Sequence, residues 1–265
     1  MGEAIVITSG KGGVGKTTTT VNIGTALALF GKKVCLVDSD IGLRNLDVLM
    51  GLENRIIFNL VDVAQGRCKL NAALIRDKRF DCLHVLPAAQ TVDKTAIQPR
   101  QMKKIIDELK QDYDYVLIDC PAGIEHGFKN AIEGADKSIV VTTPEAAAVR
   151  DADRVIGLLE QKKGMEPPKL IINRIRKNLV RSGEMLDVDE VVSILAIELL
   201  GIVIDDDAVI AASNRGEPIA LDPSSKASIA YRNIARRILG ESVPLSSFGE
   251  SQGFFSKLKK IIGIR

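Results

Sequence analysis

The sequence predicts an α/β fold in which a doubly wound, mostly parallel sheet carries helices on both faces. Three observations predict this fold. Short apolar, β-branched runs recur along the chain, several of them are apolar nearly throughout, and helix-like stretches lie between most of them. Strands covered on both faces have this uniformly apolar character, and alternation of strands with helices is typical of parallel sheets.

Seven strands are predicted, and helices are expected between most of them. The strands cover residues 4–8, 34–37, 83–86, 115–118, 138–142, 170–172 and 201–204. Three of the helices are clear from their periodicity and their ends: 17–30, followed by Gly31; 101–111; and 146–163, followed by Gly164.

The C-terminal quarter divides into a packed helix, a linker and a separate tail. Residues 223–240 are predicted to form the last packed helix, with Ser224 or Ser225 as its N-cap. The stretch ESVPLSSFGESQG is rich in Ser, Gly, Glu and Pro and has little periodicity. We therefore expect a folded domain over residues 1–240, a flexible linker over 241–252 and a C-terminal segment over 253–265.

Composition limits the classes of function. The chain has 265 residues, 46% apolar and 26% charged, which supplies a large core for one large domain. A net charge of +2 argues against a surface broadly devoted to nucleic acid, and with no Trp and 4% aromatic residues we expect no base-stacking platform. No specific nucleic-acid partner is expected.

Cysteine spacing and the N-terminal residues indicate a compartment. The four cysteines form no CxxC pair, and only two His residues accompany them, so we expect reduced, buried thiols in a cytosolic protein. The N-terminus lacks the basic start and long apolar core of a signal peptide. No run of about 18 apolar residues is present, and no transmembrane helix is expected.

Residues 10–17, GKGGVGKT, fit the phosphate-binding pattern G-x-x-x-x-G-K-[ST] between a predicted strand and a predicted helix. Glycines let the backbone N–H groups turn towards phosphate oxygens, and the following helix adds its positive end. Lys16 is expected to reach the β- and γ-phosphates, and the Thr17 hydroxyl to ligate Mg²⁺. The nucleotide-binding residues predicted here are Gly10, Lys11, Gly12, Gly13, Val14, Gly15, Lys16, Thr17 and Thr18.

Acidic residues end two other predicted strands. VLIDCPAG places Asp119 at a strand end, where a carboxylate can hold Mg²⁺ directly or through water, and VCLVDSDIG places Asp38 and Asp40 at another. Parallel strands bring their carboxyl ends to one edge of the sheet, so these segments are expected to converge on the phosphate-binding loop. Thr17, Asp38 and Asp119 are the predicted metal site.

The tail has the pattern of a surface-bound helix. On a helix, the apolar residues of 254–262 fall within an arc of about 120°, and a basic amphipathic helix of this kind is typical of an interfacial membrane anchor. One copy would bind anionic lipid weakly, whereas two copies on a dimer gain about 10²–10⁴ in avidity. The predicted membrane residues are Phe254, Phe255, Lys257, Leu258, Lys259, Lys260, Ile261 and Ile262.

KGGVGKTT, with a lysine at its start, resembles the deviant Walker A (ParA/MinD) family of ATPases. DSDIGLRNLD, DCPAGIE, VTTPE followed by RDADR, and ASNRGEPIALD resemble the septum-site-determining branch of that family in particular, as found in Gram-positive rods. The resemblance runs over essentially the whole chain. It implies the P-loop NTPase fold, ATP and Mg²⁺ as cofactors, and a homodimer that forms on ATP binding.

The resemblance also implies roles for single residues. Lys11 matches a lysine that reaches the phosphates bound by the other subunit, and with Lys16 and Asp40 it forms the expected catalytic set. Asp40 matches the residue that orients the attacking water, and Asp38 a Mg²⁺ partner acting through water. Asn173 matches a position that contacts adenine. Asp205 lies where the family has a proline-acidic pair, but Ile204 replaces the proline, so only a backbone contact with the base is expected there.

Partner-binding residues follow in the same way. Arg44 and Asn45 lie in a loop expected to respond to the γ-phosphate, and Asp151 and Asp153 match positions that bind the family's division inhibitor, MinC. The resemblance implies a slow, regulated ATPase that recruits this inhibitor at the inner face of the bacterial cell membrane, together with a topological factor of unknown type.

Four other functions remain open at this point. A chromosome-partition ATPase would show a basic dimer surface and no lipid-binding tail, and a flagellar-number ATPase of the same family could carry such a tail. An electron-transfer iron protein would need cysteines that bridge a cluster between subunits; Cys120 adjoins Asp119, but no second suitable cysteine is evident. A scaffold that does not hydrolyse ATP is the last alternative.

Overall fold

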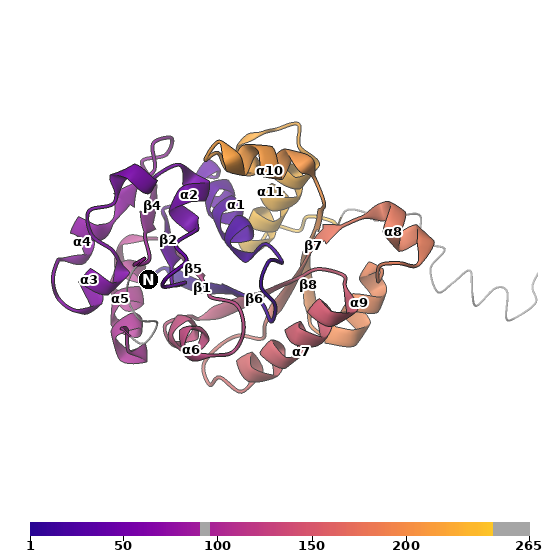
Figure 1. Ribbon diagram of the computed structural model, residues 1–265, viewed down its shortest axis with the longest axis horizontal. Helices are drawn as coiled ribbons and strands as arrows, with labels where there is room; N and C mark the ends of the chain where they lie inside the picture. Colours follow the sequence, from indigo (N-terminus) through magenta and orange to yellow (C-terminus); the bar gives the residue numbers. More distant parts are fainter. Residues whose placement is uncertain (91–95, 246–265) are drawn as a thin grey trace, which may run out of the picture.

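An eight-stranded sheet crosses the centre of the computed structural model, which describes residues 1–90 and 96–245 (Figure 1). Its strand order is β3-β4-β2-β5-β1-β6-β7-β8, and all neighbouring pairs are parallel except β3 and β4. The strands are β1 (Glu3–Thr8), β2 (Val34–Asp38), β3 (Ile75–Arg76), β4 (Leu83–Leu86), β5 (Tyr115–Asp119), β6 (Lys137–Thr142), β7 (Lys169–Ile175) and β8 (Glu198–Ile204).

All seven predicted strands are present, and their predicted cores lie inside the observed bounds. Strand β3 was not predicted, because two residues make no recognisable apolar run. Strands β2, β5 and β4 extend the sheet to one side of β1, and β6, β7 and β8 extend it to the other. The chain reverses its direction of winding beside β1, which is the position where open α/β sheets bind ligands.

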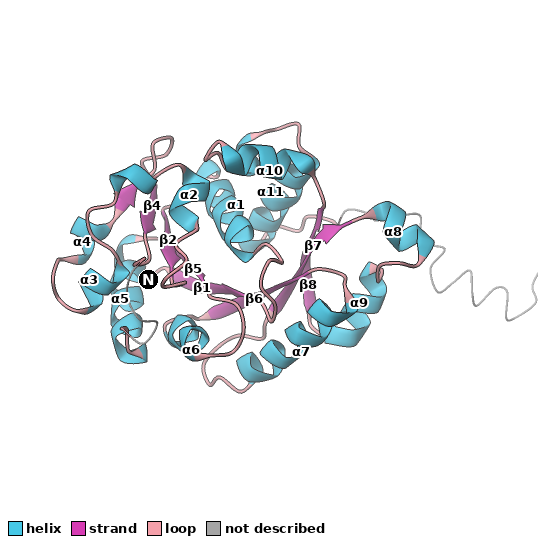
Figure 2. Ribbon diagram, in the orientation of Figure 1, coloured by secondary structure: helices cyan, strands magenta, loops and turns pink. Residues whose placement is uncertain are grey.

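Helices cover both faces of the sheet, as predicted (Figure 2). One layer contains α1, α2, α10 and α11, and the other contains α3, α4, α5, α6, α7 and α9. The helices are α1 (Lys16–Leu29), α2 (Leu46–Met50), α3 (Leu60–Ala64), α4 (Leu70–Ala73), α5 (Pro99–Asp112), α6 (His126–Glu133), α7 (Ala146–Glu160), α8 (Lys177–Ser182), α9 (Val188–Leu195), α10 (Asp207–Asn214) and α11 (Lys226–Ile238), with short 3₁₀ turns at Glu53–Arg55 and Ile219–Leu221.

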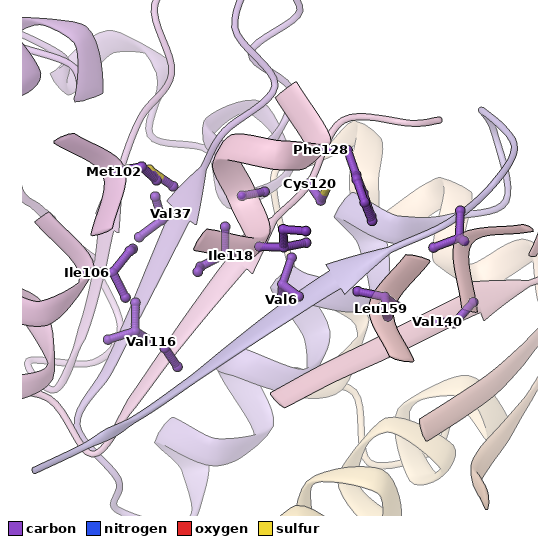
Figure 3. Packing of buried hydrophobic residues seen from close by; sticks show 14 of the residues in the cluster. Val6, Val37, Met102, Ile106, Val116, Ile118, Cys120, Phe128, Val140 and Leu159 are labelled. Carbon is purple, nitrogen blue, oxygen red and sulfur yellow. The ribbon is translucent and has the colours of Figure 1, made fainter. Parts of the chain in front are cut away.

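Two apolar cores result, one on each face of the sheet. Figure 3 shows the core under α5, α6 and α7, where side chains from neighbouring strands meet those of the helices. Val6, Val37 and Ile118 contribute from three strands, and Met102 and Phe128 from two helices. Alternate residues of each buried strand thus supply opposite cores, which explains the nearly continuous apolar runs in the sequence.

The helix ends follow local sequence signals. Helix α1 is followed by Gly31 in the left-handed conformation, with φ 76°, as the sequence predicted. Helix α5 begins with Pro99, and a capping box joins Gln98 and Gln101. Helix α11 is shorter than predicted and begins after Ser225, whose side chain accepts a hydrogen bond from the Ser228 N–H.

The chain leaves α11 along β8. The Arg237 guanidinium donates hydrogen bonds to the carbonyl oxygens of Leu200, Val243 and Pro244 at 2.8–3.0 Å. These bonds hold the start of the predicted linker, residues 241–245, against the domain. The rest of the predicted linker and the whole predicted membrane helix lie outside the described residues. Within residues 1–90 and 96–245, no helix has the length and apolar character needed to cross a membrane.

Candidate nucleotide-binding site

The phosphate-binding loop and the two acidic strand ends meet at one edge of the sheet. The loop, residues 10–15, follows β1 and leads into α1. On one side of β1, Ile7 lies in register with Asp119 of β5, and Asp119 lies in register with Asp38 of β2. This common edge, the carboxyl edge of the sheet, is the site that parallel strands provide for ligands.

Glycines shape the loop in two ways. Gly13 and Gly15 have φ values of 80° and 96°, in the left-handed region that favours glycine. Gly10 lies against α7, where a Cβ atom would be 2.1 Å from the carbonyl oxygen of Asp151. The conformation of the loop and its packing on α7 therefore both require glycine.

The two lysines of the loop have different surroundings. Lys16 is 8% exposed and begins α1. The Lys11 side chain is 44% exposed, and its Nζ lies 3.5 Å from Oε2 of Glu145, at the start of α7. Lys16 thus belongs to the interior of the site, whereas Lys11 lies at its surface.

The carboxylate of Asp119 is buried, and its neighbours only partly offset the cost of burying its charge. Burial raises its pKa to about 6, and Thr17, Lys16 and Thr20 oppose this shift. The Thr20 hydroxyl lies 3.2 Å from Asp119 Oδ1 and donates to it. A buried carboxylate whose pKa remains raised favours a bound cation.

Asp38 organises the loop that follows β2. Its carboxylate accepts hydrogen bonds from the backbone N–H groups of Asp40 at 3.0 Å and Leu46 at 3.3 Å. Burial, and then the charge of Asp119, raise the pKa of Asp38. Asp40 follows Asp38 at the same edge and is half-buried, so the three predicted acidic residues do converge.

The donor set fits a magnesium ion held together with a nucleotide. No group of three or more metal-binding His, Cys, Asp or Glu side chains is found in the described part of the chain. Mg²⁺ in nucleotide sites commonly uses one or two protein oxygens and completes its shell with phosphate oxygens and water. Thr17, Asp119 and, through water, Asp38 supply that kind of set.

The loop between β2 and α2 contains an unusual backbone position. Arg44 has a φ of 44°, and its Nε lies 3.0 Å from Oδ2 of Asp47, whose side chain is fully buried. Burial raises the pKa of Asp47 and the Arg44 charge opposes that shift. Asn45, the residue before α2, is exposed. The predicted γ-phosphate-responsive loop is thus held by a buried ion pair.

A cavity lies where β7 and β8 end, next to the phosphate-binding loop. Its volume is about 180 Å³, which leaves room for an organic group. The predicted base-binding residues Asn173 and Asp205 both line it, together with Gly15, Thr18, Arg174, Arg176, Val203, Ile204, Asp206, Asp207, Val209, Ile210 and Tyr231.

Asn173 and Asp205 also make contacts that the sequence did not predict. The Asn173 Nδ2 donates to the carbonyl oxygen of Val14 at 2.8 Å, so this side chain braces the phosphate-binding loop. Asp205 pairs with Arg176 at 2.5 Å, and its N–H donates to the Ile175 carbonyl. Both residues remain at the cavity wall, where a base can contact them.

Sequence reasoning missed several residues of this cavity. Arg174 has a φ of 54° and directly follows Asn173, and the Tyr231 hydroxyl lies 3.4 Å from the Thr19 hydroxyl. Tyr231 lies on α11, which is far from the loop in sequence. Only tertiary packing brings it there, so no local signal could have identified it.

Of the two predicted partner residues on α7, Asp151 borders the loop. The Asp151 backbone contacts Gly10, as described above, and its carboxylate lies 3.9 Å from Arg154. Asp153 is exposed.

Of the four cysteines, Cys35 and Cys120 are buried, whereas Cys68 and Cys82 are only partly buried, and all four are free thiols.

Known proteins are similar to this chain in sequence and in fold. A family model described as an AAA domain matches residues 2–172. The septum site-determining protein MinD of Bacillus subtilis (strain 168) is 68% identical over the full length of both chains. The MinC:MinD cell division protein complex of Aquifex aeolicus contains a chain with 51% identity and a TM-score of 0.87, covering 94% of this chain and 100% of its own.

A third similar protein was solved with its nucleotide. The septum site-determining protein MinD of Pyrococcus horikoshii OT3, complexed with Mg-ADP, has 31% identity and a TM-score of 0.81, and the match covers 92% of this chain and 100% of that one. The phosphate-binding loop, the converging carboxylates and these matches over nearly the whole length lead to one conclusion: the chain belongs to the MinD family of septum site-determining proteins.

Proposed function

We propose that this protein is an ATP-dependent, dimerising, membrane-associated ATPase that positions the division site by recruiting the inhibitor MinC to the membrane. The observation that carries the proposal is the different placement of the two lysines in one phosphate-binding loop. Lys16 is buried in its own site, and Lys11 is 44% exposed beside Glu145. A cation at the surface of the loop is available to a second subunit.

Within one subunit, the chain binds and orients the reactants. Backbone N–H groups of residues 10–15 and the Lys16 ammonium hold the phosphates, and Asn173 and Asp205 border the base. Thr17, Asp119 and, through water, Asp38 would hold Mg²⁺, which would supply positive charge to offset the negative charge of the phosphates. Asp40 orients the attacking water, so that ATP and water give ADP and phosphate.

Across the dimer, Lys11 completes the partner's site. Its charge stabilises the negative charge that develops during phosphoryl transfer, as an arginine finger does. Two facing lysines repel each other unless phosphates lie between them, so dimerisation depends on bound ATP. Hydrolysis then removes the link between the subunits and releases the dimer.

The dimer connects nucleotide binding to location. Arg44, Asn45, Asp151 and Asp153 form the surface offered to MinC, and a MinD relative with 51% identity was solved in a complex with MinC. The tail residues Phe254 to Ile262 bind anionic lipid, and two tails on one dimer raise the avidity by about 10²–10⁴. The protein therefore alternates between the cytoplasm and the inner face of the membrane, where a topological factor sets its distribution.

Co-sedimentation with anionic lipid vesicles tests the proposal. The full chain should sediment with ATP and Mg²⁺ and remain in solution with ADP or without nucleotide. Lys11→Ala should abolish both ATP-dependent dimerisation and sedimentation, whereas Asp40→Ala should sediment with ATP but hydrolyse it slowly. Deletion of residues 253–265 should leave ATP binding intact and remove sedimentation.

Four outcomes would contradict the proposal. An unchanged ATP-dependent dimer in Lys11→Ala would remove the role of Lys11 across subunits. Normal turnover in Asp40→Ala would remove that residue from the reaction. Vesicle binding after deletion of the tail, or ATP-dependent binding to DNA in place of vesicles, would exclude the proposed anchor.

A further inference from the structure

The side chain of Asn173 joins β7 to the phosphate-binding loop. Asn173 lies on β7, two strands away from β1 in the sheet, and is 4% exposed. Its Nδ2 donates to the Val14 carbonyl oxygen at 2.8 Å, and its Oδ1 accepts from the Arg174 N–H at 3.0 Å. Because a carbonyl can only accept and an N–H can only donate, both bonds fix the same orientation of the amide.

The bond to Val14 determines where one N–H group of the loop points. No cis peptide bond is found among the described residues, so the peptide bond between Val14 and Gly15 is trans and planar. In such a unit the C=O and the N–H point in opposite directions. A Val14 carbonyl held towards Asn173 therefore directs the Gly15 N–H to the other side of the loop. N–H groups of this kind hold the phosphate oxygens in a phosphate-binding loop.

The neighbouring contacts leave this peptide little freedom. The Val14 side chain is 3% exposed and belongs to one of the two apolar cores. Gly15 has a φ of 96°, and a Cβ atom added there would be 2.4 Å from Asn173 Nδ2. The loop is thus built closely around the Asn173 amide.

The backbone of β7 is irregular at the same place. Arg174, the next residue, has a φ of 54°, which is unfavourable for a residue other than glycine. The pairing of β7 with β8 also changes register between Ile172 and Ile175. The hydrogen bond from the Arg174 N–H to Asn173 Oδ1 lies within this irregular turn. Backbone strain of this kind is often found where a side chain is held for a function.

We propose that Asn173 is a positioning residue for phosphate binding. By holding the Val14 carbonyl, it directs the Gly15 N–H towards the phosphates whether or not a base occupies the neighbouring cavity. The family resemblance implied only a contact with adenine for this residue. After its two bonds the amide keeps one N–H and one lone pair on Oδ1, so it can contact a base as well. This inference rests on the proposed role of the loop in holding the phosphates.

Binding of inorganic tripolyphosphate, which has phosphates but no base, tests the proposal by calorimetry on the full chain with Mg²⁺. Asn173→Ala should lower the affinity for tripolyphosphate by roughly tenfold, and the affinity for ATP at least as much. Asn173→Leu fills the space without a donor and should cause a similar loss. Asp205 lines the same base cavity, but its side chain pairs with Arg176. Asp205→Asn should therefore leave the affinity for tripolyphosphate within twofold.

A crystal structure of nucleotide-free Asn173→Ala tests the loop without any ligand. We expect the peptide between Val14 and Gly15 to rotate or to lose its order, because its carbonyl no longer has the Asn173 donor. The same peptide should keep its orientation in Asp205→Asn. An unchanged orientation in Asn173→Ala would overturn the proposal.

The binding results also define the opposite outcome. A loss of ATP affinity with unchanged tripolyphosphate affinity in Asn173→Ala would leave only a contact with the base. A lower melting temperature with both affinities unchanged would leave only a structural role. Either result would overturn the proposal. If the unmodified chain does not bind tripolyphosphate, the proposed role of the loop fails, and the crystal structure still decides whether Asn173 orients the peptide. If Asn173→Ala does not fold, Asn173→Leu serves for both measurements.

Discussion

The two ends of the parallel strands use similar charged side chains in opposite ways. At the amino end, opposite charges are paired: Lys137 lies 2.7 Å from Glu3, and Lys110 lies 2.7 Å from Asp136, which also accepts from the Ala4 N–H. At the carboxyl end, Asp38 and Asp119 lie in register on neighbouring strands. Burial raises the pKa of both carboxyl groups, and a neighbouring negative charge adds to each shift: that of Asp119 for Asp38, and that of Asp40 for Asp119.

This difference separates stability from function. The chain satisfies its own charges at the amino end, so those residues stabilise the fold without any ligand. At the carboxyl end the chain leaves negative charge that Mg²⁺ and the phosphate-binding loop must balance together. A site that needs its ligand to become electrostatically complete is a site that responds to that ligand. Matched substitutions at the two ends can break or sharpen this comparison.

The largest effect is expected for hydrolysis. Asp119→Asn should lower ATP turnover by roughly 10²–10³, because a neutral amide is a poor partner for Mg²⁺ and its waters. Asp136→Asn makes the same chemical change at the amino end and should leave turnover within twofold. Phosphate release assays on both variants with ATP, Mg²⁺ and vesicles measure this, and equal losses would remove the distinction between the two ends.

A somewhat smaller effect is expected from the contact between the loop and α7. Gly10→Ala places a methyl group 2.1 Å from the Asp151 carbonyl oxygen, so the loop or the helix must move, and kcat/KM should fall by roughly 100-fold. Gly157→Ala, also on α7, meets no atom within 4 Å and should stabilise the helix slightly. Normal kcat/KM in Gly10→Ala would show that this packing does not position the loop.

Stability should depend on pH through Asp119. Its pKa of about 6 in the folded protein lies above the ordinary value of 3.8. The nucleotide-free protein should therefore become less stable as pH rises from about 4 to about 6, because its free energy of unfolding decreases over that range. Asp119→Asn removes this loss and should be more stable than the unmodified chain at pH 7.5 by about 1–3 kcal/mol. Urea titrations at pH 5 and 7.5 measure the difference, and a variant less stable at pH 7.5 would contradict it.

The smallest effect is expected at the amino end. The hydrogen bond that the Lys137 ammonium donates to Glu3 raises the pKa of Lys137, but both side chains are about one-third exposed, at 32% and 30%. Glu3→Gln should therefore reduce the free energy of unfolding by less than about 1 kcal/mol and leave nucleotide binding unchanged. Urea titration and fluorescent-nucleotide binding check this, and altered ATP affinity would show that the two ends are coupled.

The sequence predicted the features that local patterns encode. Uniformly apolar runs identified seven strands, and the loop pattern identified Lys16 and Thr17 because those residues stand at fixed spacings. The convergence of the strand-end carboxylates of Asp38 and Asp119 was predicted because parallel strands bring their carboxyl ends to one edge of a sheet. Each of these inferences depended on residues a few positions apart.

The rest depended on contacts between distant segments. Asn173 was predicted at the base but also holds the Val14 carbonyl, 159 residues away, and the packing of Gly10 on Asp151 joins the loop to a helix that begins over 130 residues later. Neither the positive φ of Arg44 nor its ion pair with the buried Asp47 is indicated by a local pattern. Such contacts result from how the layers pack, and a single sequence does not reveal them.

The stabilisation of the folded chain by Mg²⁺ and ADP tests the central claim most directly. Melting temperatures measured with ADP plus Mg²⁺ and with ADP plus EDTA give a Mg²⁺-dependent increment for each variant. We expect Asp119→Asn to lose most of this increment and to be more stable than the unmodified chain without nucleotide. Asp136→Asn should be less stable but keep the full increment. A full increment in Asp119→Asn, or its loss in Asp136→Asn, would contradict the assignment of function to the carboxyl end and stability to the amino end.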